Sequence, residues 1–337
     1  MRRIVALLLL LVPMLGAAPQ ERKGLEIVYV DVEGGAATLI GTPSGETILV
    51  DAGWPEDRDA ERIRRAVVEV LGARQIDHYI TSHWHLDHWG AIGRLAKLIP
   101  VKRYYGHVFP ETPQDDIVPE MKAAWMAVSE GNRVWVKPGD KLPLAAGVDV
   151  TFLSSNGDVI GDPSGTAQIR ECATHPAAEI DPSENARSVG FRLTFGGFRF
   201  LDLGDLTWNI EHRLVCPKNL IGPIDLYQVT HHGWDPSNHP ALVSGIAPTV
   251  AVINNGPKKG GTVKVFRTLK ATPSIKDIWQ LHRNVETTSA DNAAPEFTAN
   301  DDEACKGEIV RVSVTPDGKS YTVSIPAKGT TRTYSSR

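Results

Sequence analysis

Four potential metal ligands lie within six residues of one another, at His83, His85, Asp87 and His88. They form the pattern H-x-H-x-D-H, and imidazole nitrogens with carboxylate oxygens suit divalent ions such as zinc or manganese. His83 and His85 are two apart in an extended segment, so they project to the same side and can chelate one ion. Asp87 and His88, after the turn, can serve a neighbouring ion. The pattern therefore predicts a metal centre, with Asp87 also a candidate proton acceptor.

The cluster directly follows a short predicted strand at residues 76–81, so an adjoining sheet must position it. Before it, alternating β-rich segments predict strands at residues 25–32, 36–41 and 46–50. An apolar stripe at Ile63, Ala66, Val67, Val70 and Leu71 predicts an amphipathic helix. A second helix is expected at residues 91–99. The first part of the chain is therefore interpreted as strands, helix, strand, metal cluster and helix.

The later part of the chain repeats this character. After a helix at 121–130 and strands at 134–136 and 148–153, residues 154–182 form a long segment that is interpreted as a functional loop. Strands at 188–195 and 198–203 flank the turn pair Gly196-Gly197 and predict a hairpin. Further strands are expected at 224–230, 248–254, 275–281, 308–315 and 321–325. Two β-rich halves with helices outside predict an α+β protein with a four-layer αββα sandwich.

The hexad resembles the signature of the metallo-β-lactamase superfamily, whose fold is this αββα sandwich with the metals at one edge between the sheets. By this resemblance Asp51, in LVDAG, orients the metal loop, and Asp205, in FLDLGDL, bridges both ions. The pair His231-His232 looks like the late histidine motif. Since neighbouring residues on an extended backbone point in opposite directions, one of the two is expected to ligate. Alignment with the family's G-H-G favours His232 and the strand end favours His231, leaving the other as a supporting group or proton donor.

A finer similarity links the chain to the ComEC-like branch and its secreted free-standing relatives, among which bacterial phosphorylcholine esterases are also similar. It rests on S-V-x-F-R-L-x-F-G-G-F-R-F-L-x-x-G-D over residues 188–205 and on H-H-G over residues 231–233. Many superfamily members carry a further histidine shortly before residue 188, which this chain and the ComEC-like branch lack. Asn185 or water is therefore the candidate that completes the first ion's ligands beside His83, His85 and Asp205.

These resemblances imply a hydrolase with two divalent ions, zinc or manganese, that share a bridging hydroxide. The ComEC-like similarity favours a phosphodiester substrate, and a lactonase or β-lactamase is the alternative. A non-catalytic metal-binding protein is disfavoured, because a structural zinc site is usually closed by four protein ligands. A small-molecule or phosphodiester substrate fits the net charge of −4 better than a dedicated nucleic-acid partner. The pattern specifies no oligomeric state.

Charged and aromatic residues near the motif loops carry less information. The basic pair Lys258-Lys259 is interpreted as solvated loop charge rather than a phosphate contact. Five tryptophans adjoin motif loops and either line a pocket or pack the sandwich edge: Trp54, Trp84, Trp89, Trp208 and Trp234. Isolated histidines are interpreted as structural: His78, His107, His175, His212 and His282.

The start of the chain has the plan of a secretory signal. Arg2 and Arg3 precede a nearly all-apolar stretch at residues 4–15, and small residues follow at 16–18. A signal peptide is predicted at residues 1–18, with an uncleaved anchor as the alternative, and a secreted or periplasmic hydrolase domain at 19–337. Residues 300–337 are expected to form a C-terminal β-hairpin of that domain. One pair among Cys172, Cys216 and Cys305 can bridge in an oxidising compartment.

Overall fold

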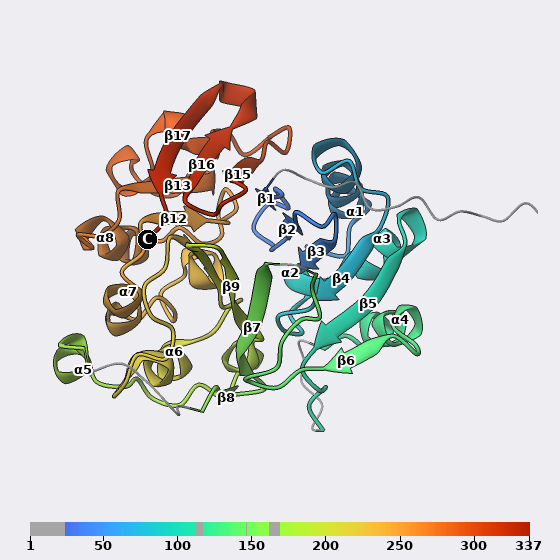
Figure 1. The fold of residues 1–337 in the computed structure, drawn as a ribbon, viewed down its shortest axis with the longest axis horizontal. Helices are drawn as coiled ribbons and strands as arrows, with labels where there is room; N and C mark the ends of the chain where they lie inside the picture. Colours follow the sequence, from blue (N-terminus) through green and yellow to red (C-terminus); the bar gives the residue numbers. More distant parts are fainter. Residues whose placement is uncertain (1–23, 112–116, 146, 162–168) are drawn as a thin grey trace, which may run out of the picture.

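Two stacked β-sheets with helices on their outer faces make up the protein (Figure 1). The computed structural model describes residues 24–111, 117–145, 147–161 and 169–337, and the signal predicted at residues 1–18 lies outside the described residues. The layers run helices, sheet, sheet, helices, which confirms the predicted αββα sandwich. Among the described residues, no helix is long and apolar enough to cross a membrane.

The first sheet has nine strands in the order β17-β16-β15-β1-β2-β3-β4-β5-β6. The meander predicted at the start of the chain is antiparallel, and β3 to β6 then run parallel. The expected C-terminal hairpin has a third strand and extends this sheet beside β1. The strands are β1 (Leu25–Tyr29), β2 (Thr38–Gly41), β3 (Thr47–Val50), β4 (Ile76–Ile80), β5 (Val101–Gly106), β6 (Arg133–Trp135), β15 (Val310–Val314), β16 (Ser320–Ile325) and β17 (Thr330–Ser335).

The second sheet has eight strands in the order β14-β13-β12-β11-β10-β9-β7-β8. The hairpin predicted at Gly196-Gly197 joins β9 to β10, and β10 to β14 run parallel. The strands are β7 (Val148–Ser155), β8 (Asp158–Val159), β9 (Gly190–Phe195), β10 (Phe198–Asp202), β11 (Leu226–Gln228), β12 (Val250–Ile253), β13 (Asp277–His282) and β14 (Thr298–Asn300).

Helices cover the outer face of each sheet (Figure 1). The first sheet carries α1 (Asp57–Arg65), which continues into a π-helical turn at Ala66–Val70, with α2 (Leu86–Trp89), α3 (Ile92–Leu98) and α4 (Pro119–Val128). The second carries α6 (Trp208–Val215), α7 (Pro240–Ile246) and α8 (Val263–Ala271), while the short α5 (Glu171–Thr174) contacts α7. The apolar stripe predicted for the first helix is buried at Ile63, Ala66 and Val67.

Strand alternation explains why the sheets stack. In β1, Ile27 and Tyr29 join the cluster between the two sheets, whereas Val28 belongs to the cluster beneath the helices of the first sheet. Successive side chains of a strand point to opposite faces, so a strand that is apolar on both faces needs a layer on each side. A third cluster lies beneath α6, α7 and α8. Burying each large apolar side chain contributes roughly 1.5–3 kcal/mol.

The cysteines form one bridge. Cys172, just after the start of α5, is bonded to Cys216 at the end of α6, and Cys305 is a free thiol. The bridge ties the described part of the long segment at residues 154–182 to the helical layer of the second sheet.

Candidate metal centre

The candidate ligands meet where the carboxyl ends of parallel strands from both sheets converge. Asp51 follows β3, the hexad follows β4, and Asp205 lies three residues beyond β10. The late histidines lie in a short 3-10 segment, Thr230–Gly233, after β11. Loops at the carboxyl ends of parallel strands are a common place for ligand sites, because side chains from distant parts of the chain meet there.

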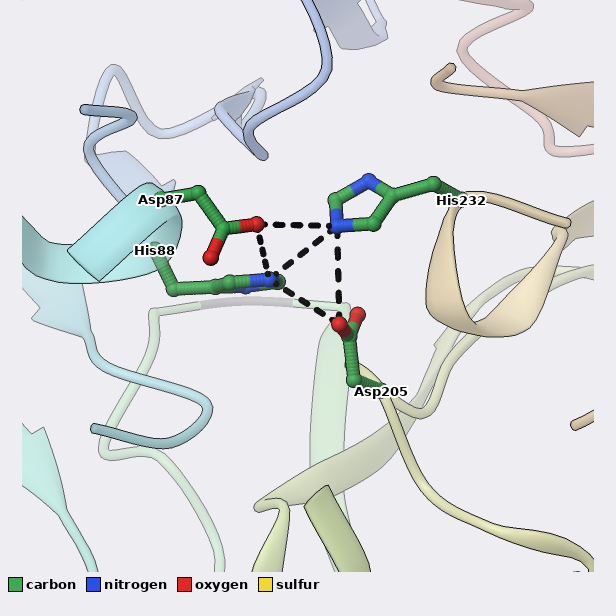
Figure 2. A group of neighbouring side chains, drawn as sticks. All are labelled: Asp87, His88, Asp205 and His232. Carbon is green, nitrogen blue, oxygen red and sulfur yellow. Dashed lines mark hydrogen bonds and ion pairs between the residues drawn. The ribbon is translucent and has the colours of Figure 1, made fainter. Parts of the chain in front are cut away.

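One compact group consists of Asp87, His88, Asp205 and His232, all of them buried (Figure 2). One ligand atom from each lies within 4.8 Å of the others. The Nε2 atom of His88 is 3.2 Å from Asp87 Oδ2, 3.2 Å from Asp205 Oδ2 and 3.2 Å from His232 Nε2. The Nε2 atom of His232 is 3.2 Å from Asp87 Oδ2 and 3.5 Å from Asp205 Oδ2. Two imidazoles and two carboxylates thus face one small space.

Hydrogen bonds on the far side of the two rings determine which nitrogen carries hydrogen. His88 donates from Nδ1 to Oδ2 of Asp51 at 2.7 Å, and His232 donates from Nδ1 to the carbonyl oxygen of Asn254 at 3.2 Å. The Nε2 atoms therefore turn lone pairs toward each other in the neutral state. Such an arrangement beside two carboxylates requires a cation, either a proton or a metal ion, so the donor set fits a divalent ion.

Asp51 is held in a strained conformation beneath this group. Its φ is +61°, a region that residues other than glycine rarely adopt. One carboxylate oxygen accepts the backbone N–H of Ser82 at 2.7 Å, and the other accepts the Ser82 hydroxyl at 2.7 Å together with His88. Burial raises the pKa of Asp51, and its bonds with His88 and Ser82 oppose that rise. This side chain orients His88 and faces away from the ligand space.

The first two histidines of the hexad form a neighbouring group. Nε2 of His83 lies 3.0 Å from Nδ1 of His85 and 3.9 Å from Oδ2 of Asp205. The Ser82 hydroxyl, which donates to Asp51, accepts from Nδ1 of His83 at 3.0 Å. Burial lowers the pKa of His83 well below its ordinary value, which favours the neutral ring that a metal ligand requires. Asp205 Oδ2 therefore lies between both groups of predicted ligands.

The paired histidines differ from the expected extended conformation. His231 and His232 both have left-handed backbone angles, with φ of 57° and 52°. This conformation brings both rings to Asp205, whose Oδ2 is 3.4 Å from Nε2 of His231. Nδ1 of His231 is 3.0 Å from the Ser237 hydroxyl, and its Nε2 is 3.5 Å from Nδ2 of Asn185. The expectation that the rings would point in opposite directions was therefore wrong.

Charge within the centre is strongly coupled. Burial alone would raise the pKa values of Asp87 and Asp205, but neighbouring histidines hold both well below the ordinary range. Burial would lower the pKa of His88, but Asp205, Asp87 and Asp51 raise it well above its ordinary value. Burial lowers the pKa of His231 to about 4, although Asp205 opposes this. Without a metal, the compact group is therefore best described as two carboxylates that share a proton held on His88.

The tryptophans divide between packing and the surface. Trp84 and Trp89 are fully buried and contact each other, and Trp84 also contacts Trp125, so they anchor α2 and the hexad. Trp234 is 43% exposed and borders a cavity of about 760 Å³ beside the His231–His232 segment. Residues lining this cavity include Trp234, Lys258, Gly260, Thr262 and Lys264. Both interpretations of the tryptophans therefore apply, at different positions.

Several contributing residues had no signal in the sequence. Asn254 supports His232 through a backbone carbonyl, which any residue type provides. Glu184, which is fully buried, accepts the backbone N–H of Trp84 at 3.2 Å within the hexad. Lys259 contacts Oδ2 of Asp87, so its interpretation as solvated loop charge was wrong, while Lys258 pairs with the exposed Glu303 as that interpretation requires.

A second cluster of potential ligands lies apart from this centre. Asp31 Oδ1 accepts from Nε2 of His282 at 2.7 Å, and Cys305 Sγ is 3.1 Å from Asp31 Oδ2. Arg62 also donates to Asp31 Oδ2, at 3.0 Å, and pairs with Glu33 at 3.1 Å. Because Arg62 already supplies positive charge there, the cluster is balanced as a buried ion pair. His282 thus has a structural partner, as expected of an isolated histidine.

Residues 30–175 match the family model of the Metallo-beta-lactamase superfamily. Among solved structures, the chain is similar to the CmlA diiron beta-hydroxylase of Streptomyces venezuelae, with 16% identity over 68% of this chain and 44% of that one, at a TM-score of 0.43. It is also similar to a Cronobacter sakazakii metallo-beta-lactamase with a HARLDQ motif, with 18% identity over 78% and 74% of the two chains, at 0.35. A third similar structure is Zn²⁺-bound PqqB of Methylobacterium extorquens, with 13% identity over 61% of this chain and 72% of that one, at a TM-score of 0.38.

The chain spans less than half the length of the CmlA protein. No curated protein matches it. The structural likenesses are distant and their named activities differ, so they bear on neither the reaction nor the substrate. The family match is more specific, because residues 30–175 contain Asp51 and the whole hexad. Residues 30–175, which are less than half of the chain, are thus similar to the metallo-beta-lactamase superfamily, and the two-sheet architecture agrees with that likeness.

Proposed function

We propose that this protein is a secreted hydrolase that uses two divalent metal ions, zinc or manganese, to cleave a phosphodiester. One observation carries the proposal. A single carboxylate oxygen, Oδ2 of Asp205, lies 3.2–3.9 Å from the Nε2 atoms of four histidines that belong to two separate ligand groups. An oxygen in that position suits a carboxylate shared between two ions. The four histidines are His83, His88, His231 and His232.

The ligand sets follow from the contacts. We assign Asp87, His88 and His232 to one ion and His83 with His85 to the other, with Asp205 between them. His231 is assigned to the second ion as well, since burial lowers its pKa to about 4 and a neutral imidazole is a ligand rather than an acid. The Ser237 hydroxyl at Nδ1 positions that ring, and Asn185, whose Nδ2 lies 3.5 Å from Nε2 of His231, is not assigned as a ligand.

The charge of the centre favours an anionic substrate. Two divalent ions would bring four positive charges to a ligand set with two carboxylates, Asp87 and Asp205. When bound, such ions supply Lewis acidity and bring the pKa of a bound water close to 7. The excess positive charge suits a phosphodiester better than a neutral lactone, because the phosphodiester carries a negative charge. The ComEC-like sequence of β9 and β10 supports the same substrate class.

The chain's own residues divide between holding and orienting. The low pKa of Asp87 makes it a poor proton acceptor, because a general base works best with a pKa near the working pH. Asp87 is therefore assigned a ligand role. Asp51 and Asn254 fix the tautomers of His88 and His232, and Ser82 fixes that of His83. The buried aromatic cluster around Trp84 holds the hexad rigid and excludes water from beneath it.

Secretion is part of the proposal. The Cys172–Cys216 bridge is compatible with an oxidising compartment, where disulfides persist. We assign residues 19–337 to one hydrolase domain exported to the periplasm or the medium, with residues 1–18 as its signal. Cell fractionation of the natural host would test this, because a cytoplasmic protein that keeps residues 1–18 would contradict it.

The hydrolase assignment is tested on bis(p-nitrophenyl) phosphate with protein prepared without chelator and supplied with zinc or manganese. We expect turnover that requires the metal and disappears in D205A. A lactone and a β-lactam are assayed beside it with the same preparations. Cleavage of either of these, without cleavage of the phosphodiester by a protein that holds two ions, would overturn the phosphodiester proposal. Absence of bound metal in the parent protein would overturn the metal-dependent hydrolase itself.

A further inference from the structure

Two neighbouring lysines in the loop after β12 have opposite environments. The side chain of Lys258 is 52% exposed, and its Nζ pairs with Glu303 at 2.6 Å. The side chain of Lys259 is 23% exposed, and its Nζ contacts Oδ2 of Asp87 inside the candidate metal centre. The same ammonium lies 5.0 Å from the ring centroid of Trp54. One lysine is therefore a surface residue, and the other belongs to the centre.

The backbone around Lys259 is fixed from two sides. Its carbonyl oxygen accepts the N–H of Gly256 at 2.9 Å, and the N–H of Gly261 donates to the carbonyl of His232 at 2.8 Å. A Cβ at Gly260 would lie 2.1 Å from the carbonyl oxygen of His232, so only glycine permits this approach. The loop that carries Lys259 is thus bound to the segment that carries His232. This packing fixes the backbone from which the Lys259 side chain reaches Asp87.

Lys259 and a metal ion would compete for one atom. Oδ2 of Asp87 is the oxygen that faces Nε2 of both His88 and His232, and the ammonium contacts the same oxygen. An ammonium and a divalent ion repel each other, so both cannot remain at full contact with it. When an ion takes Asp87, Lys259 needs another negative partner. The Lys259 side chain is partly exposed and contacts Trp54, which keeps the ammonium at the edge of the centre.

We propose that Lys259 is a substrate-binding residue that pairs with an anionic oxygen of the substrate once metal has taken Asp87. This inference rests on the proposed phosphodiesterase, and it specifies the substrate further as one with a charged oxygen next to the bond that breaks. Lysine suits this role as a compact point charge on a flexible stem. In the metal-free protein the same residue neutralises Asp87. Metal binding at Asp87 would therefore release the Lys259 ammonium, which could then pair with the substrate.

The exchange predicts opposite effects on two measured affinities. K259M removes the competitor for Asp87, so we expect the affinity for zinc to rise about 3-fold to 10-fold. The variant also loses the anion contact, so the affinity of the zinc-loaded protein for inorganic phosphate should fall at least 10-fold. K259R should keep most of the phosphate affinity. K258M is the matched control and should change neither value, since inorganic phosphate is too small to span the centre and the neighbouring cavity.

Both affinities are measured by calorimetry on the full chain, with zinc in competition with a chelator and phosphate added to the zinc-loaded protein. A merely structural role for Lys259 would weaken both affinities together and would overturn the proposal, as would equal effects of K258M and K259M. Unchanged phosphate binding in K259M would also overturn it. If the parent cleaves bis(p-nitrophenyl) phosphate but K259M has the same KM, the proposed role of Lys259 is refuted while the phosphodiesterase proposal is retained. If the parent cleaves only neutral esters, the proposed function fails first.

Discussion

Replacing Asp51 with asparagine tests whether a residue outside the ligand set controls metal binding. Asp51 acts only as a hydrogen-bond acceptor, because all three of its hydrogen bonds come from donors on Ser82 and His88. An asparagine of the same shape provides one oxygen and one NH₂ group. At least one of the donors then faces another donor, and the bond to His88 loses its charge-assisted character.

The magnitude follows from the type of bond that is lost. A buried hydrogen bond to a charged group contributes about 1.5–3 kcal/mol. Loss of an outer partner of a metal-binding histidine typically lowers metal affinity about 10–100-fold, which corresponds to about 1.4–2.7 kcal/mol. The two estimates agree, so we expect D51N to bind zinc 10–100-fold more weakly than the parent. The variant should keep its fold, because the substitution preserves side-chain volume.

Zinc affinity is measured by competition with a fluorescent chelator, and the fold is checked by circular dichroism. D57N is the matched control, because the side chain of Asp57 is 91% exposed and pairs with Arg94 rather than with a candidate ligand. Parent-like zinc affinity in a folded D51N protein would refute the reasoning, since His88 would then be oriented without the Asp51 bond. Equal losses in D51N and D57N would show that the assay reports general destabilisation.

Three further predictions follow from the same geometry. D205N should lower the zinc stoichiometry from two ions to one or none per chain by elemental analysis, and two retained ions would exclude Asp205 as a shared ligand. Burial raises the pKa of Asp202 to about 7, so its protonated form stabilises the metal-free fold at low pH, and this contribution is lost as pH rises through about 7. The shift is worth at most about 4 kcal/mol, so urea unfolding should show a smaller loss of stability between pH 5 and pH 8 in D202N than in the parent. G260A should lower the melting temperature more than G139A, since both glycines have positive φ but only at Gly260 would a Cβ meet other atoms; equal shifts would contradict the close approach to His232.

The parts of the site that could be predicted from the sequence are those formed by residues close together in the chain. The hexad packs four ligands into six residues, and β4 before it is a short strand that begins and ends with isoleucine, so both could be recognised without the rest of the chain. The inner and outer clusters of the sandwich were implied by alternation in β1 and its neighbours. The strands that went unrecognised, such as β5 and β14, are short or begin exposed, and they depend on pairing with other strands.

Other features depend on contacts that no local pattern records. The left-handed conformation of His231 and His232 arises where their segment is bound to the loop at Gly260 and Gly261, and residues other than glycine rarely adopt it. The difference between Lys258 and Lys259 is in the direction of the side chain, and two adjacent lysines give no local signal of which one turns inward. The helices α6 to α8 are recognisable afterwards from caps such as Thr262, which accepts the N–H of Val265.

The positions of the hydrogens in the centre explain why both sheets are needed for one site. The hexad alone places His83 and His88 near each other, but a free imidazole can carry its hydrogen on either nitrogen. Asp51, after β3, and Asn254, after β12, each accept an Nδ1 hydrogen and so leave the Nε2 lone pairs of His88 and His232 directed at Asp205. These acceptors come from different sheets. The ligand set therefore becomes fit for a cation only when the two sheets are packed, and metal affinity and the stability of the sandwich must be coupled.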